Sequence, residues 1–530
     1  MRMMRGLAAV SLVLAVCAGQ SPPDGKRWWS YIAYLADDKL EGRNTGSEGY
    51  QKAATYVAGE FERAGLQPAG TSGYFQPVKF QSRAIIEKDS SLTLVRDGKD
   101  EKLTLGEDGF IGMRVDPADA LEAPAVFTGY GLTVPELQYN DLAGLDLRGK
   151  IAMYVSGGPA SIPGALSSHY QSAAERGKFL ERAGVVGVAT IPNPAAMDVP
   201  WPRVALSRFQ AAMSLDDPDL SETFGLKLTA VINPAHLDKW LVGSGHSAEE
   251  ILALAKDRKP LPHFPLTVSL KAKVQAKRTN VESPNVVAVL PGSDPQLKDE
   301  YVVLSAHLDH LGIGEPINGD RIYNGAMDDA SGVATLLDIA DQLHGSKAKL
   351  RRSLLFVVVA GEEKGLLGSK YFAAHPTVKP EQMVADLNTD MFLPLFPLRI
   401  LTVYGLDESD LGKQVRAVAE PMGIRVQADQ EPQRNVFIRS DQYNFIRHGV
   451  PSLMMSVGYE KGSPEAVTAK KWLTERYHAP SDDIHQPVDL QSAADFNRVV
   501  LTLAEAVANQ NERPQWNKDS FFRRFAKSAE

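Results

Sequence analysis

From about residue 280 to the end of the chain, short apolar runs alternate with amphipathic helical patterns. The runs cover residues 285–290, 301–306, 354–360, 400–403 and 452–457. Between two of them, residues 331–344 repeat apolar side chains every three to four positions, as a helix with one buried face does. Near-continuous apolar strands separated by helices indicate a parallel sheet that is covered on both faces. We therefore expect an α/β fold with a doubly wound, mostly parallel sheet.

The residues before 280 show a different pattern of apolar and polar residues. Residues 24–66 show helical periodicity, and the following stretch to about 118 alternates as strands do. From 120 to 265 short β-like runs surround a helical segment, which indicates a smaller α/β domain inserted into the larger one. The expected domains are therefore an N-terminal part (21–119), the insert (120–265) and the main part of the large domain (266–530).

The N-terminus has the order of an export signal. Arg2 and Arg5 precede an apolar run at 7–18, which is too short to span a bilayer. Two processing routes stay open: cleavage after Ala18, giving a signal peptide of residues 1–18, or a lipoprotein signal to residue 16 with lipid on Cys17. We expect an exported protein of the periplasm, cell envelope or exterior, without a transmembrane span in the mature chain.

Composition narrows the chemistry. The chain of 530 residues has one cysteine, so a disulfide framework and a cysteine-bound zinc are both excluded. Lys and Arg total 57 against 65 Asp and Glu, and this balance of −8 argues against non-specific nucleic-acid binding. Any metal site must therefore use histidine and carboxylate ligands.

Histidines and acidic residues follow the apolar runs at several separate places. They are His307, Asp309, Asp328, Glu362, Glu363, Asp390 and His478. Taken singly, each has an ordinary explanation, such as a helix cap or an exposed first helical turn. Because ligands bind beyond the carboxyl ends of the strands in doubly wound sheets, the combination predicts a metal site on that edge.

The donor types restrict the metal. Imidazole and carboxylate without thiolate suit Zn, Mn, Co or Fe(II). Two histidines and three carboxylates are more ligands than one tetrahedral zinc ion takes, but they fit two zinc ions that share a bridging carboxylate. Two such ions about 3.5–4 Å apart can lower the pKa of a shared water toward about 7 and give a bridging hydroxide. The sequence has no Gly-x-Ser-x-Gly, phosphate-loop, dinucleotide or His-Glu-x-x-His motif, which favours this water-activating route.

At these residues the sequence resembles a known family. His-x-Asp, Asp-x-x-Ser-Gly, Gly-Glu-Glu, a later Asp and a late Tyr-His occur in the order seen in the co-catalytic di-zinc exopeptidases, the family of secreted bacterial leucine aminopeptidases and glutamate carboxypeptidases. The stretch 40–47 extends this likeness toward the N-terminus. The segments 126–131 and 146–150 resemble the protease-associated (PA) domain that many members of this family insert.

The resemblance implies a role for each donor. His307 and Asp390 would bind one zinc, Glu363 and His478 would bind the second, and Asp328 would bridge both. The cofactor would be two zinc ions per chain. The substrate would be a peptide, and the oligomeric state stays open.

The resemblance also implies roles for residues beside the metals. Asp309 would accept a hydrogen bond from the far nitrogen of His307 and fix its tautomer. Glu362 would be the general base, and Tyr477 would point at the scissile carbonyl oxygen. The bond between Asp328 and Asp329 would be a cis peptide.

Several points stay open from the sequence. The favoured activity is a zinc aminopeptidase; a carboxypeptidase or dipeptidase is the alternative, and a one-zinc glutamine-cyclising enzyme or a non-catalytic binding protein is less favoured. Asp329 is either a helix cap or part of the site. His310, Asp441 and Arg439 have no firm assignment, and His485 is expected on the surface. The insert is expected to form either a lid over the site or a spacer.

Overall fold

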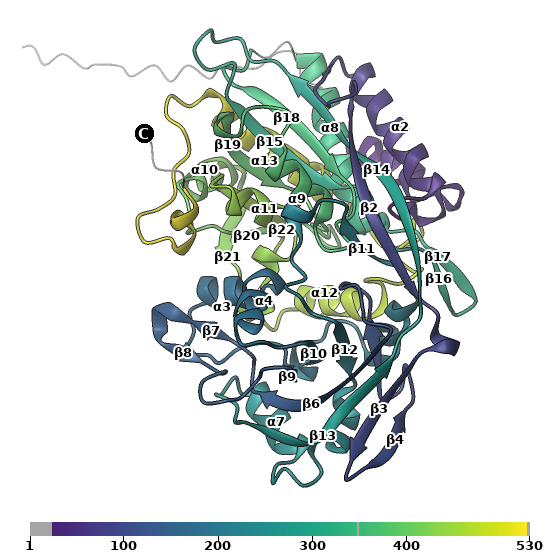
Figure 1. Cartoon of the computed structure of the whole chain (residues 1–530). Coiled ribbons are helices and arrows are strands. Elements are labelled where there is room, and N and C mark those ends of the chain that lie inside the picture. The colour runs from purple at the N-terminus through teal and green to yellow at the C-terminus, as the bar shows by residue number, and fades with distance from the viewer. Residues whose placement is uncertain (1–23, 347–348, 527–530) are drawn as a thin grey trace, which may run out of the picture.

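The structure, a computed structural model, describes residues 24–346 and 349–526. Two large sheets lie one above the other in the view of Figure 1, with ten strands in the upper sheet and eight in the lower one. None of the described helices is long and apolar enough to cross a membrane. The predicted leader, including Cys17, lies outside the described residues.

The ten-stranded sheet has a parallel centre and antiparallel sides. Its order is β11-β2-β14-β18-β15-β19-β22-β20-β21, and β1 pairs with β14. Strand β15 runs parallel to β18 and β19, and β19 runs parallel to β22. The long β2–β14 pair and the β20–β22 pair are antiparallel. The bounds are β1 Gln67–Pro68, β2 Phe75–Ile85, β11 Ala212–Leu215, β14 Ala276–Leu290, β15 Tyr301–His307, β18 Ser353–Val359, β19 Met383–Asn388, β20 Ile400–Tyr404, β21 Arg425–Ala428 and β22 Ser452–Val457.

Helices cover both faces of this sheet. On one face α1, α2, α8, α10 and α13 pack over Leu354, Phe356 and Val358 of β18. On the other face α9 and α11 pack over Leu355 and Val357 of the same strand. The predicted doubly wound arrangement is confirmed, because alternate residues of one apolar strand enter two different cores. The sheet is mixed rather than mostly parallel, because only four of its nine strand pairings are parallel. The bounds are α1 Gly25–Leu35, α2 Glu48–Arg63, α8 Ser331–Ser346, α9 Leu367–Ala374, α10 Leu411–Ala419, α11 Gln442–Arg447, α12 Pro464–Glu475 and α13 Leu490–Asn509.

The eight-stranded sheet has the order β4-β3-β13-β6-β9-β10-β12-β5. Its strands are β3 Ser91–Arg96, β4 Lys99–Leu103, β5 Gly109–Gly112, β6 Ala120–Thr128, β9 Ile151–Val155, β10 Gly187–Ile191, β12 Leu228–Ile232 and β13 His263–Lys273. The same stretch contains five helices: α3 Gly164–Gln171, α4 Ala173–Arg182, α5 Trp201–Leu206, α6 Asp238–Leu241 and α7 Ala248–Lys256. A short hairpin, β7–β8 (Thr133–Val134, Tyr139–Asn140), lies between β6 and β9, and a second, β16–β17 (Gly312–Ile317, Asp320–Tyr323), follows β15.

This second sheet does not follow the predicted boundaries at 120 and 265. Strands β3, β4 and β5 precede residue 120, yet they pair with β13 and β12 of the same sheet. Strand β11, from inside the predicted insert, pairs instead with β2 of the ten-stranded sheet. The alternating pattern of a strand does not tell which strand it pairs with, so the sequence could not assign these edge strands to one of the two sheets. The PA assignment of the region stays a prediction.

Candidate metal centre

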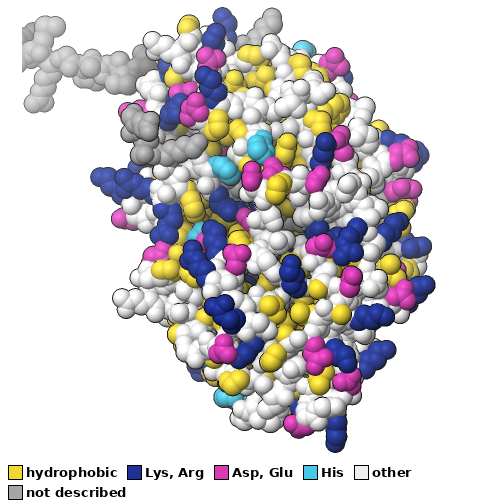
Figure 2. Space-filling model, viewed as in Figure 1, with side chains coloured by type: hydrophobic (Ala, Val, Ile, Leu, Met, Phe, Trp, Pro, Cys, Tyr) yellow, Lys and Arg dark blue, Asp and Glu magenta, His cyan; other side chains and the backbone are white. Residues whose placement is uncertain are grey.

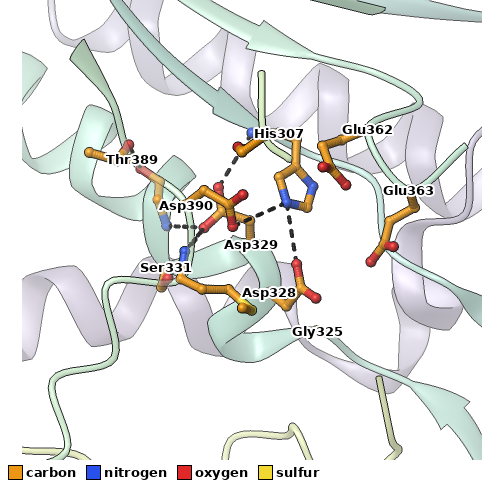
Figure 3. A network of polar contacts seen from close by, with 12 residues as sticks. His307, Gly325, Asp328, Asp329, Ser331, Glu362, Glu363, Thr389 and Asp390 are labelled. Carbon is orange, nitrogen blue, oxygen red and sulfur yellow. Dashed lines mark hydrogen bonds and ion pairs between the residues drawn. The ribbon is translucent and has the colours of Figure 1, made fainter. Parts of the chain in front are cut away.

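The predicted donors gather at one edge of the ten-stranded sheet. Strand β15 ends at His307, between the parallel strands β18 and β19, so the carboxyl ends of all three strands meet. Glu362 and Glu363 follow β18, and Asp390 follows β19. In Figure 3 these side chains converge on a common space.

One group of donors surrounds the first metal position. The Nε2 atom of His307 lies 3.2 Å from Oδ1 of Asp328 and 3.6 Å from Oδ1 of Asp390. Because His307 is 1% exposed and Asp328 is 3% exposed, these atoms are shielded from solvent. The three side chains can hold one cation among them.

A second group shares Asp328. The Nε2 atom of His478 lies 3.3 Å from Oδ2 of Asp328 and 3.3 Å from Oε2 of Glu363. Nδ1 of His310 lies 2.7 Å from Oε1 of Glu363 and 3.8 Å from Oδ2 of Asp328. His310, Asp328 and Glu363 can likewise hold a cation, so the two groups meet at the two oxygens of one carboxylate.

The unsatisfied atoms of these groups fit bound metal ions. Oδ2 of Asp328, Oε1 of Glu363 and both ring nitrogens of His310 are buried and make no hydrogen bond within the described structure. Buried polar atoms of native proteins are nearly always satisfied, and a cation satisfies both carboxylate oxygens and ring nitrogens. The donor set therefore fits two cations that share Asp328.

The backbone around Asp328 is held by buried side chains. Asp482 accepts hydrogen bonds from the amides of Met327 (2.9 Å) and Asp328 (3.1 Å). The peptide between Asp328 and Asp329 is cis, as the resemblance implied. Asp329 accepts from the amides of Gly332 and Met391, so it caps α8 and ties that helix to the loop after β19.

Asp309 contacts His307 as expected, and it does so through its main chain. The Nδ1 atom of His307 lies 3.0 Å from the backbone carbonyl of Asp309. The Asp309 carboxylate accepts from the amide of Glu362 (3.1 Å) and from the hydroxyl of Thr45 (2.9 Å), because the side chain turns toward the loop after β18. Asp309 orients both His307 and Glu362.

Arg43 ties the loops of the site together. Its fully buried guanidinium donates to the carbonyls of Leu308, Leu35, Asn324 and Gly325. Leu308 precedes His310, and Asn324 and Gly325 precede Asp328, whereas Leu35 ends α1. Arg43 lies in the family-like stretch 40–47, but no role was predicted for it, since three of its four partners lie more than 260 residues away along the chain.

The electrostatics of the site follow from many acids in a small volume. Burial raises the pKa of Glu362 well above its usual range, and Glu363 and Asp390 add to this effect. Burial acts against the charged form of His478, but the carboxylates of Glu363 and Asp328 outweigh it and raise its pKa to about 10. Burial also raises the pKa of Asp441 to about 7. The edge thus concentrates negative charge that a cation would neutralise.

A cavity of about 130 Å³ opens beside the metal positions. Asp328, Glu362, Asp390 and His478 line its inner end, and the Tyr477 ring packs 3.9 Å from that of His478. Its outer wall consists mainly of Met391, Leu393, Phe396, Tyr404, Val436, Met454, Val457, Tyr459 and Leu473. The cavity can therefore receive an apolar group next to the reacting centre.

The residues that the sequence left open fall into different places. His310, which follows the strand of His307 and had no assigned role, is fully buried inside the second donor group. Asp441 is buried beneath the site, and His485 is exposed as expected. The side chain of Arg439 is 49% exposed and lines the small cavity, with Asp198 3.9 Å away.

The eight-stranded part of the protein contributes a wall of the site. Asp198, between β10 and α5, forms an ion pair with Arg434 at 2.8 Å. Arg203 of α5 donates to the carbonyls of Tyr477 and Leu473. These contacts hold α5 against the loop that carries His478.

The donors all lie in a stretch that comparison with known proteins identifies. Residues 285–504 match Peptidase family M28. The match covers less than half of the chain. The matched segment contains His307, Asp328, Glu363, Asp390 and His478, in agreement with the resemblance to the co-catalytic zinc exopeptidases.

Two curated relatives align with this chain over only part of their own length. Aminopeptidase Y of Saccharomyces cerevisiae is 29% identical over 38% of this chain, and the probable leucine aminopeptidase 2 of Aspergillus oryzae is 28% identical over 41%. The alignments span 35% and 43% of these relatives' own lengths. Among solved structures, an aminopeptidase from Aneurinibacillus sp. strain AM-1 superimposes with a TM-score of 0.56 at 20% identity, covering 93% of this chain and 95% of that one. This structural similarity extends the shared fold beyond residues 285–504.

Proposed function

We propose that the protein is a di-zinc metallo-aminopeptidase that removes N-terminal residues from peptides. The observation that carries the proposal is the pair of donor groups that share Asp328, with Glu362 next to them. The names of the curated relatives, both aminopeptidases, support the same activity.

The proposed ligands divide as the two donor groups do. His307 and Asp390 would hold one zinc, Glu363 and His478 the other, and Asp328 would bridge them. Bound zinc polarises a scissile carbonyl and lowers the pKa of water toward neutrality. Imidazole and carboxylate donors without thiolate suit this metal.

Glu362 is the proposed general base. Its carboxylate lines the small cavity beside Asp328, and the hydrogen bond from its amide to Asp309 fixes its backbone. Burial and nearby acids raise its pKa, which brings a carboxylate closer to the pKa that proton transfer at neutral pH favours. It would accept a proton from the attacking water and transfer that proton to the leaving amine.

Tyr477 is the proposed hydrogen-bond donor to the carbonyl oxygen. Burial raises the pKa of its hydroxyl well above the usual value, so the phenol stays protonated at neutral pH. It lines the same cavity as Glu362 and packs on the ring of His478. A neutral donor at this position could stabilise the negative charge that develops on the oxygen.

The small cavity supports cleavage at the N-terminal end. Its volume of about 130 Å³ and its apolar wall suit the side chain of one terminal residue. The carboxylates of Glu362 and Asp390 at its inner end can attract a free ammonium group. A longer chain on that side would meet the wall that Asp198 and Arg434 close.

One observation favours a second candidate, a dipeptidase or carboxypeptidase. Arg439 lines the same cavity, and its one ion-pair contact among the described residues is the long one to Asp198. A guanidinium in this position could bind a free substrate carboxylate in place of an amine. The metal chemistry would be the same in both cases.

Blocked peptides test the two candidates against each other. We expect protein stripped with a chelator to be inactive and to regain turnover when zinc is added back. The reloaded protein should cleave Leu-Gly-Gly and its C-terminal amide but spare the N-acetylated peptide. Cleavage of the N-acetylated peptide with resistance of the amide would instead support the second candidate. Failure to cleave any of the three would contradict the proposal.

The proposed place of action is the periplasm, the cell envelope or the exterior, with peptides as the partner and no nucleic acid. This rests on the charged-then-apolar order of the first 18 residues and on the acidic balance of the chain. Fractionation of cells that produce the full chain tests it: the protein in the cytosolic fraction would contradict export.

A further inference from the structure

A second, much larger cavity reaches the metal centre from the other side. Its volume is about 1200 Å³, and its walls come from both sheets, including β2, β11 and the segment after β5. At one end it is lined by Glu363 and His478. The small apolar cavity contacts Glu362 and Asp390, and His478 lines both cavities, so the two cavities reach the metal positions through partly different donors.

Lys364 and Arg114 line the large cavity without an ion pair or side-chain hydrogen bond to any described residue; the same holds for Lys227 and for Arg176, which packs over the ring of Tyr154. Lys364 directly follows Glu363 and is 5% exposed. The carboxylates of Asp309 and Glu363 act on it electrostatically, yet neither forms an ion pair with it, and both already serve the metal centre. Arg114, in the segment after β5, is exposed toward this space.

Lys364 and Arg114 lie close together. A Cβ atom at Gly365 would be 3.6 Å from Nη1 of Arg114, so this guanidinium lies against the loop that carries Lys364. Burial lowers the pKa of Lys364, and the positive charge of Arg114 adds a smaller effect in the same direction. Two like charges brought together by separate parts of the fold are stabilised when an anion lies between them.

Acidic side chains of the cavity wall are already engaged. Glu222 pairs with Lys370 and Arg447, Asp217 pairs with His375, and Asp116 pairs with Arg278. On the face shown in Figure 2, Lys and Arg likewise lie among Asp and Glu. Lys364 and Arg114 differ from the cations in these pairs because no carboxylate of the described residues forms an ion pair with them, and they face the same cavity from adjacent segments.

We propose that Lys364 and Arg114 form a subsite for the C-terminal carboxylate of a short peptide substrate, on the leaving-group side of the scissile bond. This inference rests on the proposed aminopeptidase function. A carboxylate is the anion that every unblocked peptide carries, and guanidinium and ammonium groups bind it with charge-assisted hydrogen bonds.

The position of Lys364 sets the expected length of the peptide. Because Lys364 is the next residue after the metal-site residue Glu363, its ammonium can meet the carboxylate within the first few residues after the cleaved bond. An extended chain advances at most about 3.3–3.6 Å per residue, so the contact depends sharply on length. The substrate class would be di- to tetrapeptides with a free C-terminus rather than long chains.

A peptide series tests the subsite on the zinc-loaded protein. The substrates are Leu-Gly, Leu-Gly-Gly and Leu-Gly-Gly-Gly, each as the free acid and as the amide, with leucine p-nitroanilide as a reference that lacks a carboxylate. We expect kcat/KM of the wild type to favour the free acid by about tenfold or more at one length, mainly through KM, as loss of one charged contact predicts.

The decisive variant is Arg114→Gln, because Arg114 is exposed and lies outside the catalytic machinery. It should reduce the preference for the free acid to about threefold or less and leave p-nitroanilide hydrolysis within about twofold. Arg523→Gln, a charge loss at an exposed site away from the cavity, is the matched control and should keep the preference. Lys364→Met should also abolish the preference, with zinc content measured in parallel to exclude damage to the metal centre.

The outcomes separate the subsite from the function it rests on. Equal rates on acid and amide at every length in the wild type, or an unchanged preference in Arg114→Gln, would overturn the subsite while leaving the aminopeptidase intact. Absence of p-nitroanilide and peptide hydrolysis in the zinc-loaded wild type would overturn both.

Discussion

Two buried histidines show how differently the two halves of the molecule treat the same side chain. His307 and His169 are 1% and 4% exposed, and burial disfavours the charged form of both. At the metal centre, the carboxylates of Glu362, Asp328 and Asp390 overcome this effect and raise the pKa of His307 well above its usual value. In α3, burial dominates and lowers the pKa of His169 to about 4.

The surroundings explain the difference. His169 lies where α3 meets α11 and the C-terminal segment, with the Tyr443 hydroxyl 2.9 Å from Nδ1 and the rings of Phe521 and Phe525 around it. One region therefore uses a neutral imidazole to join two parts of the fold. The other collects carboxylates around its imidazoles, an arrangement suited to cations and to catalysis rather than to stability.

The strongest test of this contrast removes the shared carboxylate. Asp328→Ala should lose bound zinc and reduce activity to below about one thousandth of the wild type, because both donor groups depend on this residue. Elemental analysis and kcat/KM on leucine p-nitroanilide measure the two effects. Retention of two zinc ions per chain would refute the bridging role.

The next test separates chemistry from metal binding within the same region. Glu362→Gln should leave zinc bound and the fold unchanged, while kcat falls by about 10²–10⁴-fold, as expected on loss of a general base. Zinc content and the thermal midpoint serve as controls for this variant. A rate near that of the wild type would mean that another group accepts the proton.

The contact at His169 should respond to pH through stability instead of activity. Its folded pKa of about 4 lies below the usual 6.5, so the stabilisation is complete above pH 6.5 and is lost as the pH falls toward 4. The free energy of unfolding should fall by about 3 kcal/mol at most over this pH range. His169→Gln should flatten that part of the pH dependence, measured by urea unfolding at pH 8 and pH 5. Equal pH dependence of variant and wild type would show that His169 does not titrate as described.

The smallest expected effect concerns His310, which is as buried as His169 but belongs to the metal centre. His310→Gln should weaken zinc binding at the second position by about 10- to 100-fold, because Nδ1 contacts Glu363 at 2.7 Å. Competition with a chelating dye measures the affinity, and His485→Gln, at an exposed site, is the control. If the affinity for zinc is unchanged in this variant, His310 is a packing residue, as His169 is, and not part of the metal centre.

The sequence predicted the centre of the fold better than its margins. The apolar runs at 301–306 and 354–360 became β15 and β18 because strands buried on both faces need apolar residues at every position. Strands β3, β4 and β5 were placed with the large domain although they belong to the eight-stranded sheet, because their alternating pattern fits either partner. The partner of an edge strand depends on which other strand the tertiary fold brings beside it, and the local sequence pattern does not contain that information.

Part of the donor set was determined by the sequence itself: strand ends fix the edge on which a side chain emerges, and parallel neighbours bring those ends together. His307, Glu363 and Asp390 meet for this reason, whereas Asp328 precedes α8 and His478 follows α12. The tertiary structure alone decided that His310 joins them, that Asp309 turns its carboxylate to Glu362, and that Lys364 and Arg114 share a cavity. These contacts join loops of different elements, and their geometry follows from how the two sheets pack rather than from the spacing of residues along the chain.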